Sequence, residues 1–261
     1  MPTLDEPEVV GDDAVAFPVD ASLDTPGTPQ SGTGQTALLT GVNAARVFGR
    51  HFGPWTPVAL RPLLEERSVL KRAVDAGHAT VFANAYPRTW PGERSARRVA
   101  APPLAARAAG LLDRHEEALE AGTAVASEIT NEGWRLHLGH VHLPRVTARE
   151  AGRNLARLAS AARLTLFAHY ATDHAGHRGG LEGAVQALER VDAFLGGVVD
   201  HLGEDVLLAL ASDHGNIEDL TTGHTRNPAL GLLRGPGAAA RRREIATLLD
   251  VAPAVLGWMG G

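Results

Sequence analysis

Three short apolar runs, separated by longer segments with helical periodicity, restrict the fold of this chain more than any other feature. The runs are Ala79–Asn84, Leu164–His169 and Val206–Ser212, and their length and apolar character are typical of buried parallel strands. The segment Leu181–Leu202 repeats apolar residues at a helical period, and Thr147–Ala162 begins with the T-A-R-E pattern of a capping box. This alternation predicts an α/β fold in which helices sandwich a mostly parallel sheet.

The middle of the chain has a different composition. Tyr86–Pro103 is rich in proline and arginine and contains Trp90, which indicates that the chain leaves the sheet there. Residues 86–160 hold mostly helix and loop, so we expect a small inserted cap, with residues 1–85 and 161–261 forming the core. Further helices are predicted over Leu63–Ala76 and Arg241–Leu256. A length of 261 residues suits one large domain with such an insertion.

Composition excludes several classes of function. The net charge is -5 and the sequence has no basic stripe, which argues against a nucleic-acid partner. The chain has no cysteine, so a metal ion must be held by histidine and carboxylate, a donor set suited to Zn or Mn. No apolar run is long enough to span a membrane, and the N-terminus lacks the apolar part of a signal peptide. A cytoplasmic location is therefore expected.

The first polar cluster lies in ASDHGNIEDLTTGHTRNP, residues 211–228, directly after an apolar run. Asp213 and His214 stand where the predicted strand ends, which is the usual place for ligands in parallel α/β sheets. Adjacent side chains point in different directions, so the pair can serve two neighbouring ions, and His224 can fold back as a further ligand. An ordinary polar turn is an equally good explanation of this stretch alone.

The second cluster, ATDHAGHRGG, also follows a predicted strand. Asp173 and His177 are four residues apart, a spacing that places both side chains on one face of a helical turn. Taken alone, the stretch is also explained by a helix cap at Asp173 with exposed histidines. The same design at the ends of two strands favours the metal site.

The third cluster is a glycine- and serine-rich turn, Pro26–Gly41, that runs into a helix expected over Ala37–Val47. Amides at a helix N-terminus attract phosphate or sulfate. Ser31 supplies a hydroxyl at that end, and beside a divalent ion such a hydroxyl can lose its proton and act as a nucleophile. A simple helix cap is the alternative explanation.

Together the three clusters resemble the alkaline phosphatase superfamily, and within it the cofactor-independent phosphoglycerate mutase and phosphopentomutase branch. The family pattern D-H-G-N followed by H-T-x-N-P stands as Asp213–Asn216 and His224–Pro228. Its D-x-x-G-H pattern stands as Asp173–His177, and its nucleophile loop S-x-x-G-Q stands as Ser31–Gln35. Order and context match across residues 31–228.

The resemblance implies two divalent metal ions, Mn or Zn, and a small phosphorylated substrate. It implies that Asp173, His177 and His224 hold one ion and that Asp213 and His214 hold the second. Ser31 would bridge toward the second ion, accept the phosphoryl group and pass it to water or to another hydroxyl. The expected substrate-binding residues are Thr33, which is also the alternative nucleophile, Gly34, Gln35, Asn131 and Arg226.

The chain departs from the family pattern in two respects. The family opens with an apolar strand that ends in Asp-Gly and binds the second ion, and this sequence shows no run of that kind. Asp12, Asp13, Asp20 and Asp24 are the expected substitutes, although none has the expected setting. The second departure is size, because only about 140 residues separate Ser31 from the Asp173 motif.

Three functional hypotheses follow. The first is a metal-dependent phosphoryl-transfer enzyme, either a phosphomonoesterase or a small phosphomutase-like protein. The second is a non-catalytic relic that binds metal or phosphate but lacks one metal ligand. The third is an enzyme with the same metal site that acts on a different ester, either a sulfatase or a phosphodiesterase.

Overall fold

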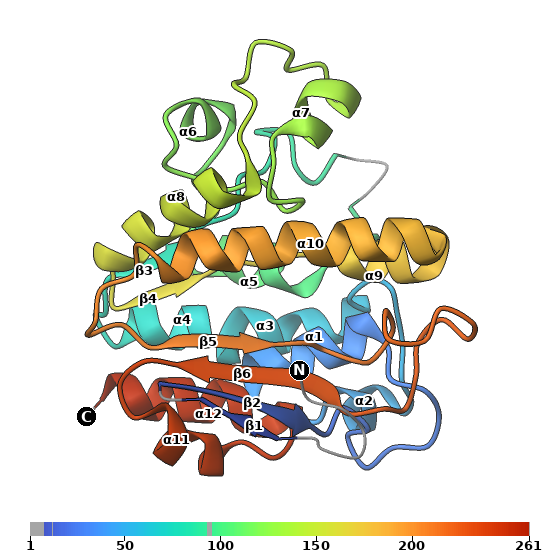
Figure 1. Ribbon diagram of the computed structural model, residues 1–261. Helices are drawn as coiled ribbons and strands as arrows, with labels where there is room; N and C mark the ends of the chain where they lie inside the picture. The colour runs from blue at the N-terminus through green and yellow to red at the C-terminus, as the bar shows by residue number, and fades with distance from the viewer. Residues whose placement is uncertain (1–7, 12, 93–95, 261) are drawn as a thin grey trace.

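The computed structural model describes residues 8–11, 13–92 and 96–260. Four strands form one sheet in the order β1-β2-β6-β5, and two more form a separate pair, β3-β4 (Figure 1). The strands of the four-stranded sheet are β1 (Val9–Val10), β2 (Ala14–Val19), β6 (Ala229–Arg234) and β5 (Leu208–Ala211). The separate pair consists of β3 (Thr80–Phe82) and β4 (Leu164–Leu166).

The sheet differs from the expected one in the direction of its strands. All neighbours in the four-stranded sheet are antiparallel, whereas β3 and β4 pair in parallel. The three apolar runs did become β3, β4 and β5, but β2 and β6 were not predicted. Pro18 interrupts the β2 pattern and Pro228 directly precedes β6, and proline weakens a strand signal. The α/β content is therefore as predicted, while a mostly parallel sheet is not what the structure shows.

Two predicted helices are confirmed close to their expected limits. Helix α8 (Ala148–Ser160) begins after Thr147, and the expected capping box with Glu150 is present. Helix α10 (Gly180–Val199) follows α9 (Ala171–Arg178), which carries the second polar cluster.

Three other helices begin or break at different residues than predicted. The stretch expected to be a turn is helical from its serine, because α1 covers Ser31–Thr40, and Gly41 with φ 71° separates it from α2 (Ala44–Phe48). Ser68 divides the helix expected over 63–76 into α3 (Arg61–Arg67) and α4 (Val69–Asp75). Its backbone is extended and its hydroxyl caps the Lys71 amide.

The C-terminal helix starts later than predicted. A short helix α11 (Ala238–Arg241) and a 3-10 turn (Arg242–Glu244) come first, and α12 then covers Leu248–Met259. Thr247 forms a capping box with Asp250, which fixes the start of α12 seven residues beyond the predicted one.

The core lies between the sheets and the helices that cover them. Side chains of β2, β6, α1 and α12 form one buried cluster around Phe17 and Leu248. A second cluster joins α3, α4, β3 and α5 (Ala101–Ala108) around Leu64 and Phe82. Helices α6 (Glu116–Glu120) and α7 (Glu132–His137) lie away from the four-stranded sheet, at the top of Figure 1. The division into a core and a cap over 86–160 stays a prediction.

Candidate metal centre

Helix α9 places the first two candidate ligands. Asp173 and His177 are separated by one helical turn, and Asp173 Oδ1 lies 3.5 Å from His177 Nε2. His174 follows Asp173 directly and is exposed; the sequence did not predict it as a ligand. Gly176 lets α9 approach the loop after β5, because a Cβ there would overlap the side chain of Asn216.

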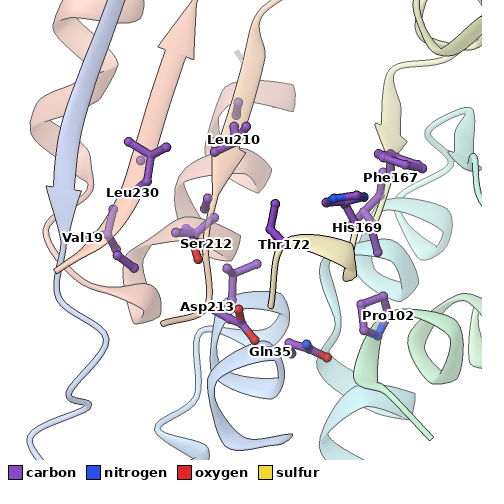
Figure 2. A pocket seen from close by; sticks show the side chains of 18 of the residues that line it. Val19, Gln35, Pro102, Phe167, His169, Thr172, Leu210, Ser212, Asp213 and Leu230 are labelled. Carbon is purple, nitrogen blue, oxygen red and sulfur yellow. The ribbon is translucent and has the colours of Figure 1, made fainter. Parts of the chain in front are cut away.

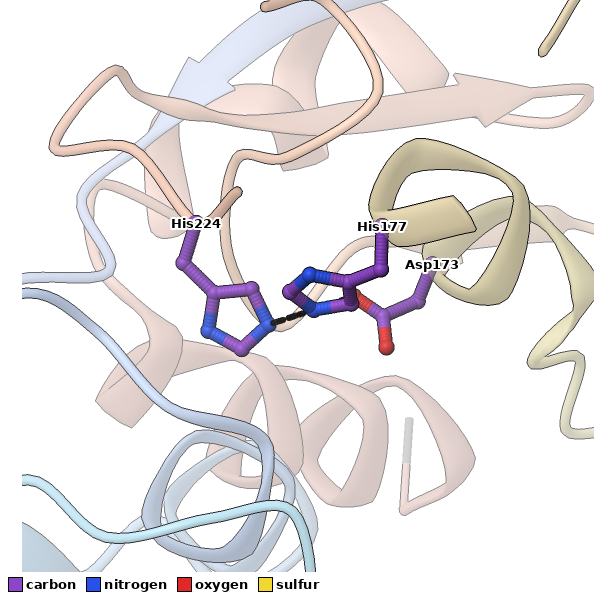
Figure 3. Close-up of side chains that lie close together, drawn as sticks. All are labelled: Asp173, His177 and His224. Atoms are coloured by element: carbon purple, nitrogen blue, oxygen red, sulfur yellow. Dashed lines mark hydrogen bonds and ion pairs between the residues drawn. The ribbon is translucent and has the colours of Figure 1, made fainter. Parts of the chain in front are cut away.

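The loops after β5 bring three more ionisable side chains to the same place. His224 Nε2 lies 2.9 Å from His177 Nε2 and 3.3 Å from Asp173 Oδ1. Figure 3 shows these three side chains pointing toward one another. His214 is buried, with Nε2 3.9 Å from Asp173 Oδ1 and 3.6 Å from Asp213 Oδ2. One carboxylate oxygen of Asp173 therefore faces three imidazole rings.

The N-terminus of α1 adds a hydroxyl to this cluster. Ser31, the first residue of the helix, is 5% exposed, and its Oγ lies 2.9 Å from His214 Nε2. No described side chain caps the N-terminus of α1. Gly34 allows the helix to lie against the loop after β5, since a Cβ there would come within 2.7 Å of the Asp213 carbonyl oxygen.

Electrostatics couple the members of the cluster. Burial acts to raise the pKa of Asp173, but the interaction with His224 and the charges of His214 and His177 outweigh it, so that pKa lies below its ordinary value. Burial acts to lower the pKa of His224, but Asp173 and the Pro29 carbonyl outweigh it and the pKa is raised. The Asp173 carboxylate and the His224 ring thus each favour the charged form of the other.

The donor set fits divalent cations. Asp173, His177 and His224 offer ligand atoms that all lie within 4.8 Å of one another. Asp213 Oδ2 is buried and accepts no hydrogen bond from the described residues, which is costly for a carboxylate unless a cation satisfies it. Carboxylate oxygens and imidazole nitrogens are the ligands that Zn and Mn accept in the absence of cysteine.

The cluster lines a cavity of about 2160 Å³. Ser31, Asp173, Asp213 and His224 all contribute to its wall. Figure 2 shows Asp213 at the end of β5, with Gln35 of α1 and Pro102 of α5 on the neighbouring wall. A small molecule that enters the cavity can therefore reach both the hydroxyl and the carboxylates.

The five expected substrate-binding residues have different surroundings. Gln35 lines the cavity, and its Oε1 accepts a hydrogen bond from the Ala101 amide at 3.4 Å. Thr33 is fully buried, and its hydroxyl bonds to the carbonyl of Gln30. Gly34 makes the close approach to Asp213 described above. The described cavity wall does not include Thr33, Gly34, Asn131 or Arg226.

Asn131 and Arg226 do not contribute to the described wall of the cavity. Asn131 is buried, and its amide donates to the Pro144 carbonyl at 3.0 Å, which ties together the loops around α7. Arg226 follows the His224 loop and is exposed. The structure therefore brings the six proposed catalytic and metal-binding residues together but not these two.

The carboxylates expected as substitutes for a missing ligand have other partners. Asp13 pairs with Arg234, Asp24 pairs with Arg46, and Asp20 accepts hydrogen bonds from Ser22. Asp12 lies outside the described residues.

Glu218 is a functional candidate that the sequence reasoning missed. Its Oε2 accepts from the Asn216 amide at 2.7 Å, and its Oε1 accepts from Thr225 Oγ1 and from Asn227 Nδ2. It thereby joins the loop that carries Asp213 and His214 to the loop that carries His224. The sequence signal that could have identified it is its position between the two family patterns, two residues after Asn216.

Comparison with known proteins finds similarity in the C-terminal part of the chain. Residues 143–260 match the model of the Metalloenzyme superfamily. The chain is 38% identical over 96 residues to the 2,3-bisphosphoglycerate-independent phosphoglycerate mutase of Desulforudis audaxviator, covering 34% of this chain and 19% of that protein. It is 40% identical over 98 residues to the enzyme of the same name from Haloarcula marismortui, again covering 34% and 19%. The resemblance predicted from the motifs is thus confirmed.

These relatives are much longer than the matched segment. The chain spans about a fifth of the length of the phosphoglycerate mutases that it matches. Among solved structures, a protein of Pyrococcus horikoshii aligns with a TM-score of 0.48 and 16% identity, over 73% of this chain and 51% of that one.

Proposed function

From the match of residues 143–260 to the Metalloenzyme superfamily, we propose that this protein is a metal-dependent phosphoryl-transfer enzyme with a serine nucleophile. The observation that carries the proposal is the hydroxyl of Ser31, held 2.9 Å from His214 Nε2 beside a cluster of carboxylates and imidazoles. In this proposal, Asp173, His177 and His224 hold one divalent ion, and Asp213 and His214 hold a second. Bound divalent ions supply Lewis-acid stabilisation of negative charge on phosphoryl oxygens.

The protein's own residues position the nucleophile. Ser31 is fixed at the start of α1, where its hydroxyl faces the cavity wall formed by His214 and Asp213. The N-terminus of α1 has no side-chain cap, although the Thr33 amide donates to the Phe52 carbonyl, and the partial positive charge of this helix end favours an anionic phosphoryl group. These features support a small phosphorylated substrate that approaches through the cavity.

The proposed transfer has two balanced steps. Ser31 Oγ forms a bond to phosphorus, and the bond between phosphorus and the leaving oxygen breaks. The leaving oxygen keeps the electron pair and receives, through solvent, the proton that Ser31 releases. Water or a second hydroxyl then attacks phosphorus, the bond to Ser31 Oγ breaks with its electron pair on Oγ, and Oγ takes up, through solvent, the proton that the attacking group loses.

The test compares Ser31→Ala with the parent chain on a chromogenic phosphomonoester in the presence of Mn²⁺ or Zn²⁺. We expect Ser31→Ala to lower kcat by roughly a thousandfold or more while the bound metal is retained. Ser22→Ala is the matched control, because the Ser22 hydroxyl bonds to Asp20 and lies outside the cluster. Undiminished turnover by Ser31→Ala would overturn the role of this serine.

The remaining alternatives give different outcomes in the same assay. Retained activity in Ser31→Ala with loss in Thr33→Ala would move the nucleophile to Thr33. Faster turnover of a chromogenic sulfate or phosphodiester than of the monoester would change the ester class. Tight metal binding without turnover of any ester would identify a non-catalytic binding protein.

A further inference from the structure

The loop after α2 lies directly against the start of the helix that carries Ser31. The Thr33 amide donates to the Phe52 carbonyl at 3.0 Å, and the Phe52 amide donates to Thr33 Oγ1 at 3.2 Å. A Cβ at Gly32 would overlap the Trp55 carbonyl oxygen, so only glycine lets the loop come this close. The backbone of Trp55 is therefore fixed beside the residue that follows the proposed nucleophile.

An arginine is held over the indole ring of Trp55. The Thr56 amide donates to the Val99 carbonyl at 2.9 Å, and this bond brings the preceding residues, Trp55 and Arg98, close to each other. The guanidinium carbon of Arg98 lies 5.9 Å from the centroid of the Trp55 ring. No described carboxylate forms an ion pair with Arg98, so the described part of the chain leaves its charge unneutralised.

The segment 96–101, which carries this arginine, is anchored at two further points. Arg61 Nη2 donates to the Ala96 carbonyl at 2.9 Å, and the Ala101 amide donates to Gln35 Oε1 at 3.4 Å. Gln35 belongs to α1, so the segment is tied to the helix that also carries the proposed nucleophile. The place of the tryptophan and arginine pair relative to α1 is therefore set by hydrogen bonds along the backbone.

Trp55 and Arg98 line the same cavity as Ser31. Trp55 is 39% exposed and Arg98 is exposed, so both side chains are open to solvent. Pro54 and Pro102 also line the cavity, which makes this part of its wall largely apolar. Tryptophan offers a large rigid surface for contact, and an arginine over its face keeps positive charge there. This wall is therefore available to the rest of a substrate whose phosphoryl group reaches Ser31.

The flat groups on this wall favour a flat ligand. The indole and the guanidinium are both planar, and each stacks on aromatic rings. Among the described residues of 52–56 and 96–102, Arg98 is the only cation that lines the cavity, so an anionic group would find one partner there. A planar ring would find two stacking surfaces. The chemistry of this wall therefore favours an aromatic ring over a second anionic group.

We propose that Trp55 and Arg98 bind the leaving group of the phosphomonoester and select one that carries a planar aromatic or heteroaromatic ring. Nucleoside monophosphates and aryl phosphates belong to this class of substrate. The two side chains contact the part of the ester that departs, whereas Ser31 and the metal cluster act on the phosphoryl group. This inference rests on the proposed function, since it names the substrate class of the same site.

A matched pair of esters tests the proposal. Adenosine 5′-monophosphate and ribose 5-phosphate have the same phosphoryl group on the same sugar oxygen, and the first carries a planar base that the second lacks. Calorimetric titration of the full chain with Ser31→Ala, loaded with Mn²⁺, measures the affinity for each ester without turnover. We expect the adenosine ester to bind at least about fivefold more tightly, the gain that stacking of one base provides.

Substitutions in the same Ser31→Ala background localise the preference. Trp55→Ala and Arg98→Ala should each lower the ratio of the two affinities by at least about fivefold. Arg98→Lys keeps the charge but loses the planar group, so it should lower the ratio as well. Arg50→Ala is the matched control, because Arg50 lies over the Phe52 ring at 5.8 Å and is not part of the described cavity wall. Arg98 is exposed, so its two variants suffice if Trp55→Ala does not fold.

Three results would overturn the proposal. One is equal affinity for the two esters, or no binding of either. Another is an equal loss of preference in Arg50→Ala and Arg98→Ala, which would indicate a general effect of charge. The third is tighter binding of 3-phosphoglycerate than of the adenosine ester, lost in Arg98→Ala and kept in Arg98→Lys, which would identify a subsite for an anion.

Failure of the proposed function has a different signature. If the parent chain turns over no ester while the Ser31→Ala chain still prefers the adenosine ester, the catalytic proposal fails and the ring subsite stands. If the parent chain turns over both esters and the Ser31→Ala chain shows no preference, the ring subsite is refuted and the catalytic proposal stands.

Discussion

Asp173 contacts three imidazole rings in the candidate site. Its Oδ1 lies within 3.9 Å of nitrogen atoms of His177, His214 and His224, which come from two distant parts of the chain. Because a single oxygen faces all three rings, loss of this carboxylate would leave the imidazoles to repel one another whenever they are protonated. Asp173 is therefore a candidate metal ligand, and its negative charge also offsets the repulsion between protonated imidazoles.

Glu218 has a supporting role at the same scale, and a substitution tests it. Glu218→Gln replaces an acceptor oxygen by an amide donor and breaks part of the three-way contact with Asn216, Thr225 and Asn227. We expect a loss of about 1 kcal/mol or less in the free energy of unfolding at neutral pH, because the side chain is partly open to water. Urea unfolding in the presence of a chelator measures it.

The pH dependence of that loss follows from the pKa of Glu218. Burial acts to raise this pKa, but the hydrogen bonds from Thr225, Asn216 and Asn227 outweigh it, so the folded pKa is lowered. The stabilisation is thus present above the unfolded pKa of about 4.3 and is lost as pH falls through the folded value. The difference between parent and Glu218→Gln should shrink in acid, and a constant difference would contradict the assignment.

At the scale of elements, the contact between α8 and α10 depends on glycine. A Cβ at Gly152 of α8 would overlap the Phe194 carbonyl oxygen, and a Cβ at Gly197 of α10 would overlap the Arg149 carbonyl oxygen. The two backbones therefore approach as closely as they do only because these positions lack a side chain. Helix α10 also contributes residues to the wall of the cavity.

Two alanine substitutions in the same helix should have opposite effects. Gly197→Ala should lower the free energy of unfolding by about 1–3 kcal/mol, because the methyl group forces the helices apart. Gly183→Ala has open space around its Cβ, so it should raise stability by about 0.4–1 kcal/mol through lower unfolded-state entropy. Urea unfolding measures both, and equal effects would refute the close contact.

At the scale of the whole molecule, the cluster joins side chains from segments that are far apart in the sequence. Ser31 comes from α1, Asp173 and His177 from α9, and His214 and His224 from the loops between β5 and β6. A bound cation would tie these segments together, and any ligand that binds only the folded state adds to stability. The metal centre is thus expected to contribute to the stability of the whole chain.

Metal addition should therefore raise the melting temperature, and a chelator should reverse the effect. At a free Mn²⁺ or Zn²⁺ concentration one hundred times Kd, the expected gain is about 2.7 kcal/mol. His177→Ala should weaken metal binding by at least about tenfold and remove most of the shift. His174→Ala, at an exposed neighbouring position outside the cluster, should keep it.

Elemental analysis of the same samples gives the stoichiometry. We expect two ions per chain for the parent protein and one or none for His177→Ala. A melting temperature that no divalent cation changes would contradict the metal centre. An equal loss in His174→Ala and His177→Ala would instead indicate damage to α9.

By itself the sequence determined the local features of this protein. The limits of α8 and α10, the shared helical turn of Asp173 and His177, and the position of Asp213 and His214 just after a strand depend on residues close together in the chain. Capping, helical periodicity and strand length depend on residues that are close in the chain, so they can be predicted without a structure. The motif order likewise predicted the superfamily that the comparisons bear out.

Only the tertiary structure decided how these pieces combine. The antiparallel sheet depends on β2 pairing with β6 across more than two hundred residues, and proline near both strands hides them locally. Ser31 meets His214 across 183 positions, and no periodicity records such a contact. The cavity between β4 and β5 exists because two sheets stop short of each other, a property of packing between elements that neither strand encodes alone.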